Sequence, residues 1–436
     1  MQTQLTLDLF IEHNREGTYL TLPFSMPAGT ESLTLAYRYE RHHETETPMA
    51  NGSFAARQEI NIIDLGLIAP DGSQVGASGS DKCEIALSEL RATPGYRPTA
   101  LAAGEWQILV GAYKIAPAGV RVTYELTFTP KHLRLLKGDL HTHTLASDGV
   151  LTVEELGWRA ARHGLDFVAI TDHNQMLSAE ALPHIPGLTL IPGMEWTHYQ
   201  GHANFLGVDR PYEGSFATHT PAEARDRFDS ARQRGALITI NHPFEEGMGF
   251  GLDLNSLPYD CLEIWNGPMR ESNLRAIGFW QSLLSAGKRV PICGGSDYHR
   301  DTPFLFLGGP TTCVYAQSAS PADILSALRQ GHAYIVFAPN GPSLELNAGE
   351  ALLGDSLPWS AGQEMEITVT GLFAGDVVRV VTAGGTTTLL QAPAAGRFHT
   401  AYPVDGPGFA RVEILRAFLP GLPMLPALIS NPIYFE

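Results

Sequence analysis

Between about residues 137 and 335, apolar strand-like runs alternate with helices whose starts carry capping residues. Thr152 is followed by Glu155 at the third helical position, which is the capping-box pattern. Thr220 and Ser320 each precede a proline, which is favoured at the first position of a helix. Repeated strand–helix–strand units favour parallel strands with right-handed crossovers. With about seven such units the region predicts an α/β fold, and a closed or distorted (βα) barrel fits better than an open sheet.

The segments on either side of this region show strand patterns and almost no helical signal. Before about residue 135, short runs of alternating apolar residues are separated by clusters of Gly, Pro and Asp. Beyond about residue 340, short strands again lie between turns rich in Gly and Pro. We therefore predict three domains: an N-terminal β-sandwich at 1–135, the barrel at 136–338 and a C-terminal β-sandwich at 339–436.

Composition narrows the classes of function. The 436 residues carry a formal net charge of −17, which argues against a nucleic-acid surface because such surfaces need clustered Lys and Arg. The four cysteines are widely spaced without a CxxC pair, so we expect reduced structural thiols. The N-terminus lacks a signal-peptide pattern and no apolar run reaches the length of a membrane span, so we expect a cytoplasmic protein. The oligomeric state is left open.

His141 and His143 end the first strand expected in the barrel region. Residues two apart on a strand project to the same face, so both imidazoles leave the backbone together. Asp148 follows in a Ser-Asp-Gly turn. Two imidazoles and a carboxylate at the end of a strand are a ligand set that first-row metals favour.

Further ligand-type side chains follow the other expected strands. In a parallel barrel, functional groups gather at the C-terminal ends of the strands. Those ends carry His173, Glu195, His202, His242, Asn266, Asp297 and His299. Any one of these histidines could be a hydrogen-bonded core residue, but burying so many ionisable groups together without a metal would be costly. Their joint placement predicts a site for several metal ions.

Seven short motifs in this region resemble the PHP family (polymerase and histidinol phosphatase domain), and more closely its CehA/McbA-type metallohydrolase branch. In chain order they are HTHTLASDG, TDHN, GMEWT, GHANFLG, NHP, EIWNG and GGSDYH. The resemblance implies a distorted (βα)7, TIM-like PHP barrel that holds two or three divalent ions, with Zn, Mn or Fe as the expected metals.

The resemblance also implies which residues hold the ions. The implied set is His141, His143 and Asp297 on one metal, Glu195 bridging to a second metal that takes His242, and Asp148, His173 and His299 on a third. Many PHP members have a further histidine three residues before a glycine, where this chain has Asn204 before Gly207. His202 lies two residues earlier on the same strand face and can take that place. Whether His202 or Asn204 faces the metal is left open by the sequence.

For activity, the resemblance implies a hydrolase whose nucleophile is a metal-bridging hydroxide. A phosphoesterase is the chemistry most typical of PHP domains, so a small phosphate ester is the expected substrate. A CehA-like carbamate, ester or amide hydrolase with the same metal centre is the alternative. A non-catalytic binding protein that works through its β-domains is a third possibility.

Individual roles follow from these expectations. Glu195 and Asp297 are candidate catalytic residues at the metals, and His202 or His299 would protonate the leaving group if not committed to metal. Because Arg binds phosphate through two parallel hydrogen bonds, the candidate substrate-binding residues are Asn266, Arg270 and Arg300. A solvated loop arginine is the alternative for Arg270 and for Arg300.

Overall fold

The computed structural model describes the backbone of residues 2–49 and 52–436, and the side chains of these residues except 44–49 and 52–56. The chain divides into two compact units, Met1–His132 and Leu133–Glu436. Each unit has a hydrophobic core of its own. The residues predicted to bind metal all belong to the second unit.

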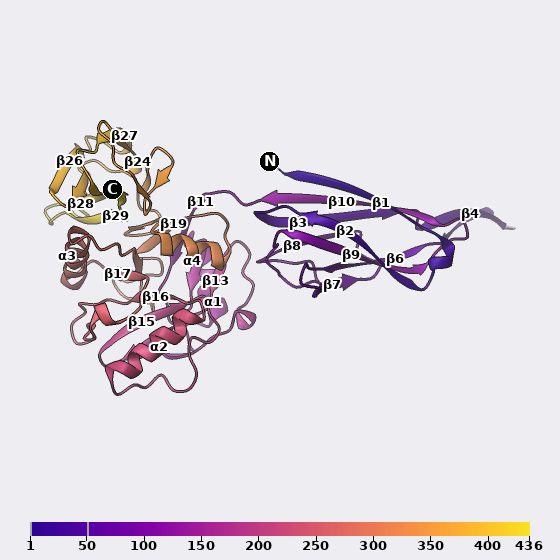
Figure 1. Ribbon diagram of the computed structural model, residues 1–436, viewed down its shortest axis with the longest axis horizontal. Helices are drawn as coiled ribbons and strands as arrows, with labels where there is room; N and C mark the ends of the chain where they lie inside the picture. Colours follow the sequence, from indigo (N-terminus) through magenta and orange to yellow (C-terminus); the bar gives the residue numbers. More distant parts are fainter. Residues whose placement is uncertain (1, 50–51) are drawn as a thin grey trace. The chain divides into compact units, whose positions relative to one another are not determined.

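The described residues of the first unit form strands and no α-helix, as the sequence predicts (Figure 1). The strands are β1 (Thr3–Ile11), β2 (Thr18–Met26), β3 (Thr30–Tyr39), β4 (His42–Met49), β5 (Gly52–Glu59), β6 (Ile62–Ile68), β7 (Gln74–Ser78), β8 (Glu84–Ser88), β9 (Gly104–Lys114) and β10 (Val120–Pro130). One antiparallel sheet has the order β1-β10-β3-β8 and another the order β2-β9-β6-β7, while β4 and β5 form a hairpin. Both sheets contribute to one core that buries Trp106, Ile108 and Tyr124.

The second unit contains the α-helices that the caps predict. They are α1 (Val153–Arg162), α2 (Pro221–Gln233), α3 (Glu271–Ser285) and α4 (Pro321–Gln330). The capping box of α1 is formed, with Thr152 and Glu155 accepting each other's backbone N–H. Thr220 and Ser320 cap α2 and α4 in front of a proline. The helices pack against neighbouring strands and so fix where those strands end.

Ten strands accompany these helices within the fully described range 133–336. They are β11 (Arg134–Asp139), β12 (Phe167–Ala169), β13 (Thr189–Ile191), β14 (Gly193–His198), β15 (Gly201–Leu206), β16 (Leu237–Ile240), β17 (Cys261–Asn266), β18 (Ile292–Gly295), β19 (Thr311–Ala316) and β20 (Ala333–Val336). Helix α1 packs on β12, α2 on β16, α3 on β17 and α4 on β19. This is the mixed α/β architecture expected from the strand–helix alternation.

The prediction of one distorted (βα)7, TIM-like barrel is not confirmed. The strands form two sheets, with β14-β15-β16-β17-β18 in one and β13-β12-β11-β19-β20 in the other. Strand β15 pairs antiparallel with both β14 and β16, because only Tyr199 and Gln200 separate β14 from β15 and the chain reverses without a crossover helix. Isolated bridges join Thr142 to Tyr298 and His173 to Glu195. These bridges bring the ends of the two sheets together, and the site lies there.

The last hundred residues continue the sheet that contains β11. Their strands are β21 (Ser343–Ala348), β22 (Ala351–Leu352), β23 (Ser356–Leu357), β24 (Glu364–Leu372), β25 (Val377–Thr382), β26 (Gly385–Gln391), β27 (Gly396–Pro403), β28 (Gly408–Arg416), β29 (Leu425–Ser430) and β30 (Ile433–Phe435). The order β19-β20-β29-β28-β25-β26 runs through one sheet, and β22-β21-β24-β27 form another. The domain division at 136–338 and 339–436 stays a prediction, since one sheet crosses that boundary.

Three of the four cysteines, Cys261, Cys293 and Cys313, are buried free thiols, and Cys83 is an exposed free thiol. This agrees with the expectation of reduced cysteines. Among the described residues, none of the helices combines the length and the apolar character that a transmembrane span requires. The cytoplasmic location stays a prediction.

Candidate metal centre

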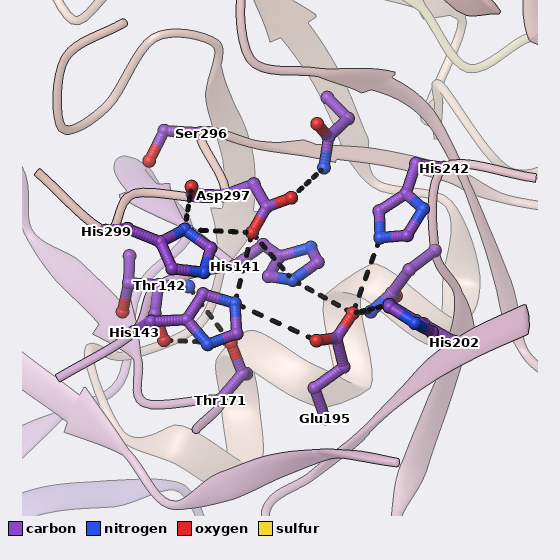
Figure 2. Close-up of polar contacts among 12 residues, drawn as sticks. His141, Thr142, His143, Thr171, Glu195, His202, His242, Ser296, Asp297 and His299 are labelled. Carbon is purple, nitrogen blue, oxygen red and sulfur yellow. Dashed lines mark hydrogen bonds and ion pairs between the residues drawn. The ribbon is translucent and has the colours of Figure 1, made fainter. Parts of the chain in front are cut away.

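The side chains predicted as metal ligands gather where the two sheets of the second unit meet. They are His141, His143, Asp148, His173, Glu195, His202, His242, Asp297 and His299. All but Asp148 lie on a strand or just beyond one: His141 and His143 after β11, His173 after β12, Glu195 on β14, His202 on β15, His242 after β16, and Asp297 and His299 after β18. Asp148 lies in the loop between β11 and α1. Figure 2 shows several of these imidazoles directed toward the carboxylates of Glu195 and Asp297.

Glu195 is the residue that most of these histidines share. Its Oε1 lies 3.2 Å from Nε2 of His141, 3.2 Å from Nδ1 of His202 and 3.4 Å from Nε2 of His242. Its Oε2 lies 2.7 Å from Nδ1 of His173. The side chain is almost completely buried at the centre of the cluster. One carboxylate therefore presents each of its oxygens to a different set of imidazoles, as a bridging ligand does.

Two further carboxylates, those of Asp297 and Asp148, also contact histidines of the cluster. Oδ1 of Asp297 lies 3.0 Å from Nε2 of His143 and 3.4 Å from Nε2 of His141. Oδ1 of Asp148 lies 3.2 Å from Nε2 of His299 and 3.5 Å from Nε2 of His173. Asp148 is more than half exposed, so this side of the cluster opens to solvent.

The candidate ligand atoms fall into four overlapping groups, each with all its atoms within 4.8 Å of one another. The groups are His143, Asp148, His173 and His299; His141, His143 and Glu195; His141, His242 and Asp297; and Glu195, His202 and His242. Nε2 of His141 and Nε2 of His143 are buried and make no hydrogen bond, although carboxylate oxygens surround both atoms. Imidazole nitrogens directed into a nest of carboxylates without hydrogen-bond geometry fit divalent cations well.

His202 and Asn204 make different contacts. The His202 ring reaches Glu195 inside the cluster. Asn204 instead donates to the backbone oxygen of Leu140 at 3.1 Å and accepts from Nδ2 of Asn241 at 2.9 Å. These contacts favour His202 over Asn204 as the candidate ligand, which stays a prediction.

The charges of the cluster act strongly on one another. Burial would raise the pKa of Glu195, but His141 and hydrogen bonds from neighbouring histidines hold that pKa well below its usual range. The pKa of Asp297 is likewise held low, against burial, by His141 and His143. Burial would lower the pKa of His141, but Asp297, Glu263 and Glu195 raise it well above its usual value. For His143 burial dominates and lowers the pKa. The carboxylates are therefore ionised and ready to hold cations.

Two ligand candidates occupy an unusual backbone conformation. Asp297 has φ of 53° and His242 has φ of 25°. Residues other than glycine seldom adopt such positive φ values, and the cost is of order 1–3 kcal/mol each. Strain of this kind persists only where the surroundings over-determine the conformation, so contacts around both turns must hold it in place.

A layer of buried carboxylates behind the ligands was missed by the sequence reasoning. Asp139 accepts from the backbone N–H groups of Ser296 and Gly308, and burial raises the pKa of Asp139 to about 6. Asp172 accepts from the backbone and hydroxyl of Thr144, both at 2.7 Å. Glu263 contacts His141. Asp172 and Glu263 lie within the quoted motifs, and Asp139 lies two residues before the first of them. Their polar type beside apolar strand residues was the available signal.

The three predicted substrate-binding residues are placed differently. Nδ2 of Asn266 lies 3.3 Å from Oδ2 of Asp297, at the edge of the cluster. Nη2 of Arg270 lies 3.5 Å from Oδ1 of Asn266, and its Nη1 pairs with Glu245 at 2.6 Å. Arg300 is exposed, and no ion pair or hydrogen bond of its side chain occurs within the described part of the chain. Arg270 and Asn266 thus adjoin the cluster of candidate ligands and Arg300 does not. Substrate binding by all three stays a prediction.

Comparison with known proteins bears on the same segment. The PHP domain family matches residues 139–221. This part of the chain is PHP-like. It contains His141, His143, Asp148, His173, Glu195 and His202. The PHP resemblance is thereby supported, while the narrower CehA/McbA branch stays a prediction.

Three relatives align with parts of this chain. A 3′,5′-nucleoside bisphosphate phosphatase of Chromobacterium violaceum is 34% identical over 107 residues, covering 23% of this chain and 37% of the relative. The 5′-3′ exoribonuclease Rnm of Escherichia coli is 41% identical over 80 residues, covering 16% and 27%. The DNA polymerase/3′-5′ exonuclease PolX of Bacillus subtilis is 27% identical over 157 residues, covering 34% and 26%. The chain thus spans well under half the length of each relative.

Two of these names concern nucleic acids, so the exclusion of nucleic acids based on charge is not supported.

Among solved structures, a two-domain protein of Bacteroides vulgatus with a predicted PHP-like metal-dependent phosphoesterase is similar at a TM-score of 0.39 and 20% identity. That similarity covers 68% of this chain and 95% of the other.

Proposed function

We propose that this chain is a metal-dependent hydrolase of the PHP type, and that its preferred substrate is a phosphate ester. The observation that carries the proposal is Glu195, a buried carboxylate shared by the imidazoles of His141, His173, His202 and His242. A bridging carboxylate in a nest of imidazoles is typical of centres with closely spaced divalent ions. The phosphatase and exoribonuclease relatives support the choice of phosphate chemistry.

The residues present fit two or three divalent ions, with Zn, Mn or Fe as candidates. His141, His143, Asp297 and Glu195 would hold one, Glu195, His202 and His242 another, and Asp148, His173 and His299 with His143 a third. Bound there, the ions would lower the pKa of a water and neutralise negative charge on a phosphoryl group.

The chain's own residues would bind and orient the substrate. Arg270 lies next to Asn266 at the edge of the cluster, and its guanidinium would hold phosphoryl oxygens. Glu245 pairs with Arg270, and Ser272 donates to Glu245 at 3.0 Å, so the guanidinium is held in place before substrate arrives. His299 and His202 are the candidate proton donors to the leaving group where they are not committed to an ion. The ring of His299 is a quarter exposed and that of His202 a tenth, so His299 is the better placed to meet substrate.

A substrate panel on protein of known metal content tests the proposal. The panel contains phosphomonoesters, phosphodiesters, a short RNA oligonucleotide, aryl carbamates and aryl esters. We expect metal-dependent turnover of a phosphate ester that is lost with chelator and restored by Zn, Mn or Fe. Turnover of carbamate or ester alone would contradict the phosphoesterase and favour the CehA-like hydrolase. Metal loading without turnover of any class would favour the binding protein, and protein that takes up no metal would contradict the whole proposal.

A further inference from the structure

Glu263 is a buried carboxylate that is not among the proposed metal ligands. It lies in the middle of β17, and its side chain is 2% exposed. Oε1 lies 3.0 Å from Nδ1 of His141. Oε2 accepts from the backbone N–H of His242 at 2.8 Å and from Nδ2 of Asn266 at 3.2 Å. One side chain thus contacts a residue just after β11, a residue just after β16 and the last residue of β17.

No lysine or arginine compensates this charge. Within the described residues the only ion pair recorded for Glu263 is the one with His141. Burying a carboxylate without a cationic partner costs free energy, because the charge loses its hydration. Such a group is found where other charges or hydrogen bonds offset this cost. The partner that Glu263 does have is an imidazole whose other nitrogen is directed at Glu195 and Asp297.

The contact between Glu263 and His141 depends on the small size of Gly295. A Cβ at Gly295 would lie 2.4 Å from Cβ of His141 and 3.1 Å from Oε1 of Glu263. Any larger residue at the end of β18 would push His141 and Glu263 apart. The close approach of β17, β18 and the segment after β11 therefore depends on the absence of a side chain at Gly295.

A hydrogen bond to one ring nitrogen of a histidine decides which nitrogen is free to bind a metal. Because a carboxylate oxygen can only accept, Nδ1 of His141 donates to Oε1 of Glu263, which leaves Nε2 as the nitrogen that would offer its lone pair to an ion. Oε2 meanwhile holds the backbone of His242, whose φ of 25° is unfavourable without support. The same carboxylate fixes the direction of two candidate ligands.

We propose that Glu263 is a positioning residue of the metal centre, which fixes the ring of His141 and the turn at His242 for metal binding. This inference rests on the proposed function, because it requires that the cluster binds ions. The group His143, Asp148, His173 and His299 makes no recorded contact with Glu263. The effect of Glu263 is therefore confined to ions held by His141 and His242.

The test is a chelator competition that measures metal affinity in the full chain, with Glu263→Gln against wild type. The substitution keeps the size of the side chain and removes its charge. We expect the affinity for ions held by His141 and His242 to fall by about 10–100-fold, the range typical for loss of a hydrogen-bond partner behind a ligand. The affinity for an ion held by Asp148, His173 and His299 stays as in wild type. Unchanged affinity of every class in a folded Glu263→Gln protein would overturn the inference.

Thermal unfolding with and without metal separates positioning from a purely structural role. Metal that binds the folded state raises its melting temperature. A positioning role predicts that Glu263→Gln shrinks this metal-dependent increase, whereas a structural role lowers both melting temperatures and leaves the increase unchanged. If Glu263→Gln does not fold, Glu263→Asp decides by the same readouts, since it keeps the charge and withdraws the oxygens from His141.

Glu413→Gln is the matched control for loss of a buried carboxylate. Glu413 on β28 is 3% exposed and pairs with Arg411 at 2.5 Å, outside the cluster. We expect Glu413→Gln to lower stability and to keep wild-type metal affinity. Wild-type protein that binds no ion would refute the proposed function, whereas wild-type binding with equal binding by Glu263→Gln would refute only the role of Glu263.

Discussion

His202 and Glu195 meet diagonally across the β14–β15 hairpin, with Nδ1 of His202 at 3.2 Å from Oε1 of Glu195. The residue directly opposite Glu195 is Asn204, which turns its amide to other partners. Diagonal neighbours on one face of a sheet are within reach of long side chains. A ligand can therefore move by two residues along a strand and still reach the same carboxylate.

Replacement of His202 by alanine tests this placement. We expect His202→Ala to weaken the ion bound by Glu195, His202 and His242, and to lower kcat by at least about tenfold. Metal analysis and steady-state kinetics measure both effects. His198→Ala is the control, because His198 ends β14 of the same hairpin but bonds to the backbone oxygen of Thr218, outside the cluster. Equal metal content in His202→Ala and wild type would contradict the assignment.

Asp297→Asn keeps the shape of a side chain that contacts His141 and His143 and removes its charge. Because this carboxylate would hold an ion, we expect kcat to fall by about 100-fold or more with the fold preserved. Kinetics, metal content and circular dichroism report the outcome. Asp301→Asn is the comparison variant, since Asp301 pairs with Arg159 instead of with the cluster. Activity that survives in Asp297→Asn would exclude Asp297 from the centre.

Arg270→Ala removes the guanidinium next to Asn266. We expect KM for a phosphate ester to rise by about tenfold, a size in keeping with the loss of one charge-assisted hydrogen bond. This increase in KM is smaller than the one expected for an arginine without an acidic partner, because Glu245 already neutralises part of the charge of Arg270. Arg275→Ala, one turn along α3 and stacked over Phe244, is expected to leave KM unchanged. Identical KM values for Arg270→Ala and wild type would remove Arg270 from the substrate site.

Acid stability of the metal-free protein depends on Glu413. Burial would raise the pKa of Glu413, but Arg411 and Arg379 outweigh burial and hold the pKa below its usual value. A carboxyl with a lowered folded-state pKa stabilises the fold above its unfolded pKa of about 4.3, and this contribution is lost as pH falls through the folded pKa.

We therefore expect the wild-type melting temperature to fall more steeply below about pH 4.3 than that of Glu413→Gln, whose residue 413 does not titrate. Melting curves of both proteins between neutral pH and about pH 3 measure the difference. Parallel pH profiles would show that the pairs with Arg411 and Arg379 do not stabilise the folded state.

Much of the candidate site could be predicted because its residues obey local rules. Caps at Thr152, Thr220 and Ser320 located three helices, and the helices located the strand ends where polar side chains collect. The distorted barrel stays unconfirmed, since the hairpin at Tyr199 and Gln200 reverses β15 and the strands form two sheets that separate between β13 and β14. Alternation of strand and helix reports neighbours along the chain but not which strands pair.

The carboxylates behind the ligands escaped prediction for a different reason. Asp139, Asp172 and Glu263 act through contacts with residues far away in sequence, such as Glu263 with His141. A single acidic residue on an apolar strand has no periodic partner that would reveal its role. Such residues become visible only when the strands are brought together.

The ladder between β20 and β29 gives the C-terminal segment a part in shaping the centre. Asn431, just after β29, accepts from the backbone N–H of Ile292 at 3.0 Å and donates to the oxygen of Ala333 at 2.8 Å. Ile292 begins β18, the strand that leads to Asp297. A shortened chain that ends before β21 would leave β20 with an open edge able to recruit foreign strands, and would release the anchor of β18. The region that holds the cluster of candidate ligands is therefore expected to lose its support if the chain is cut between the second and third predicted domains.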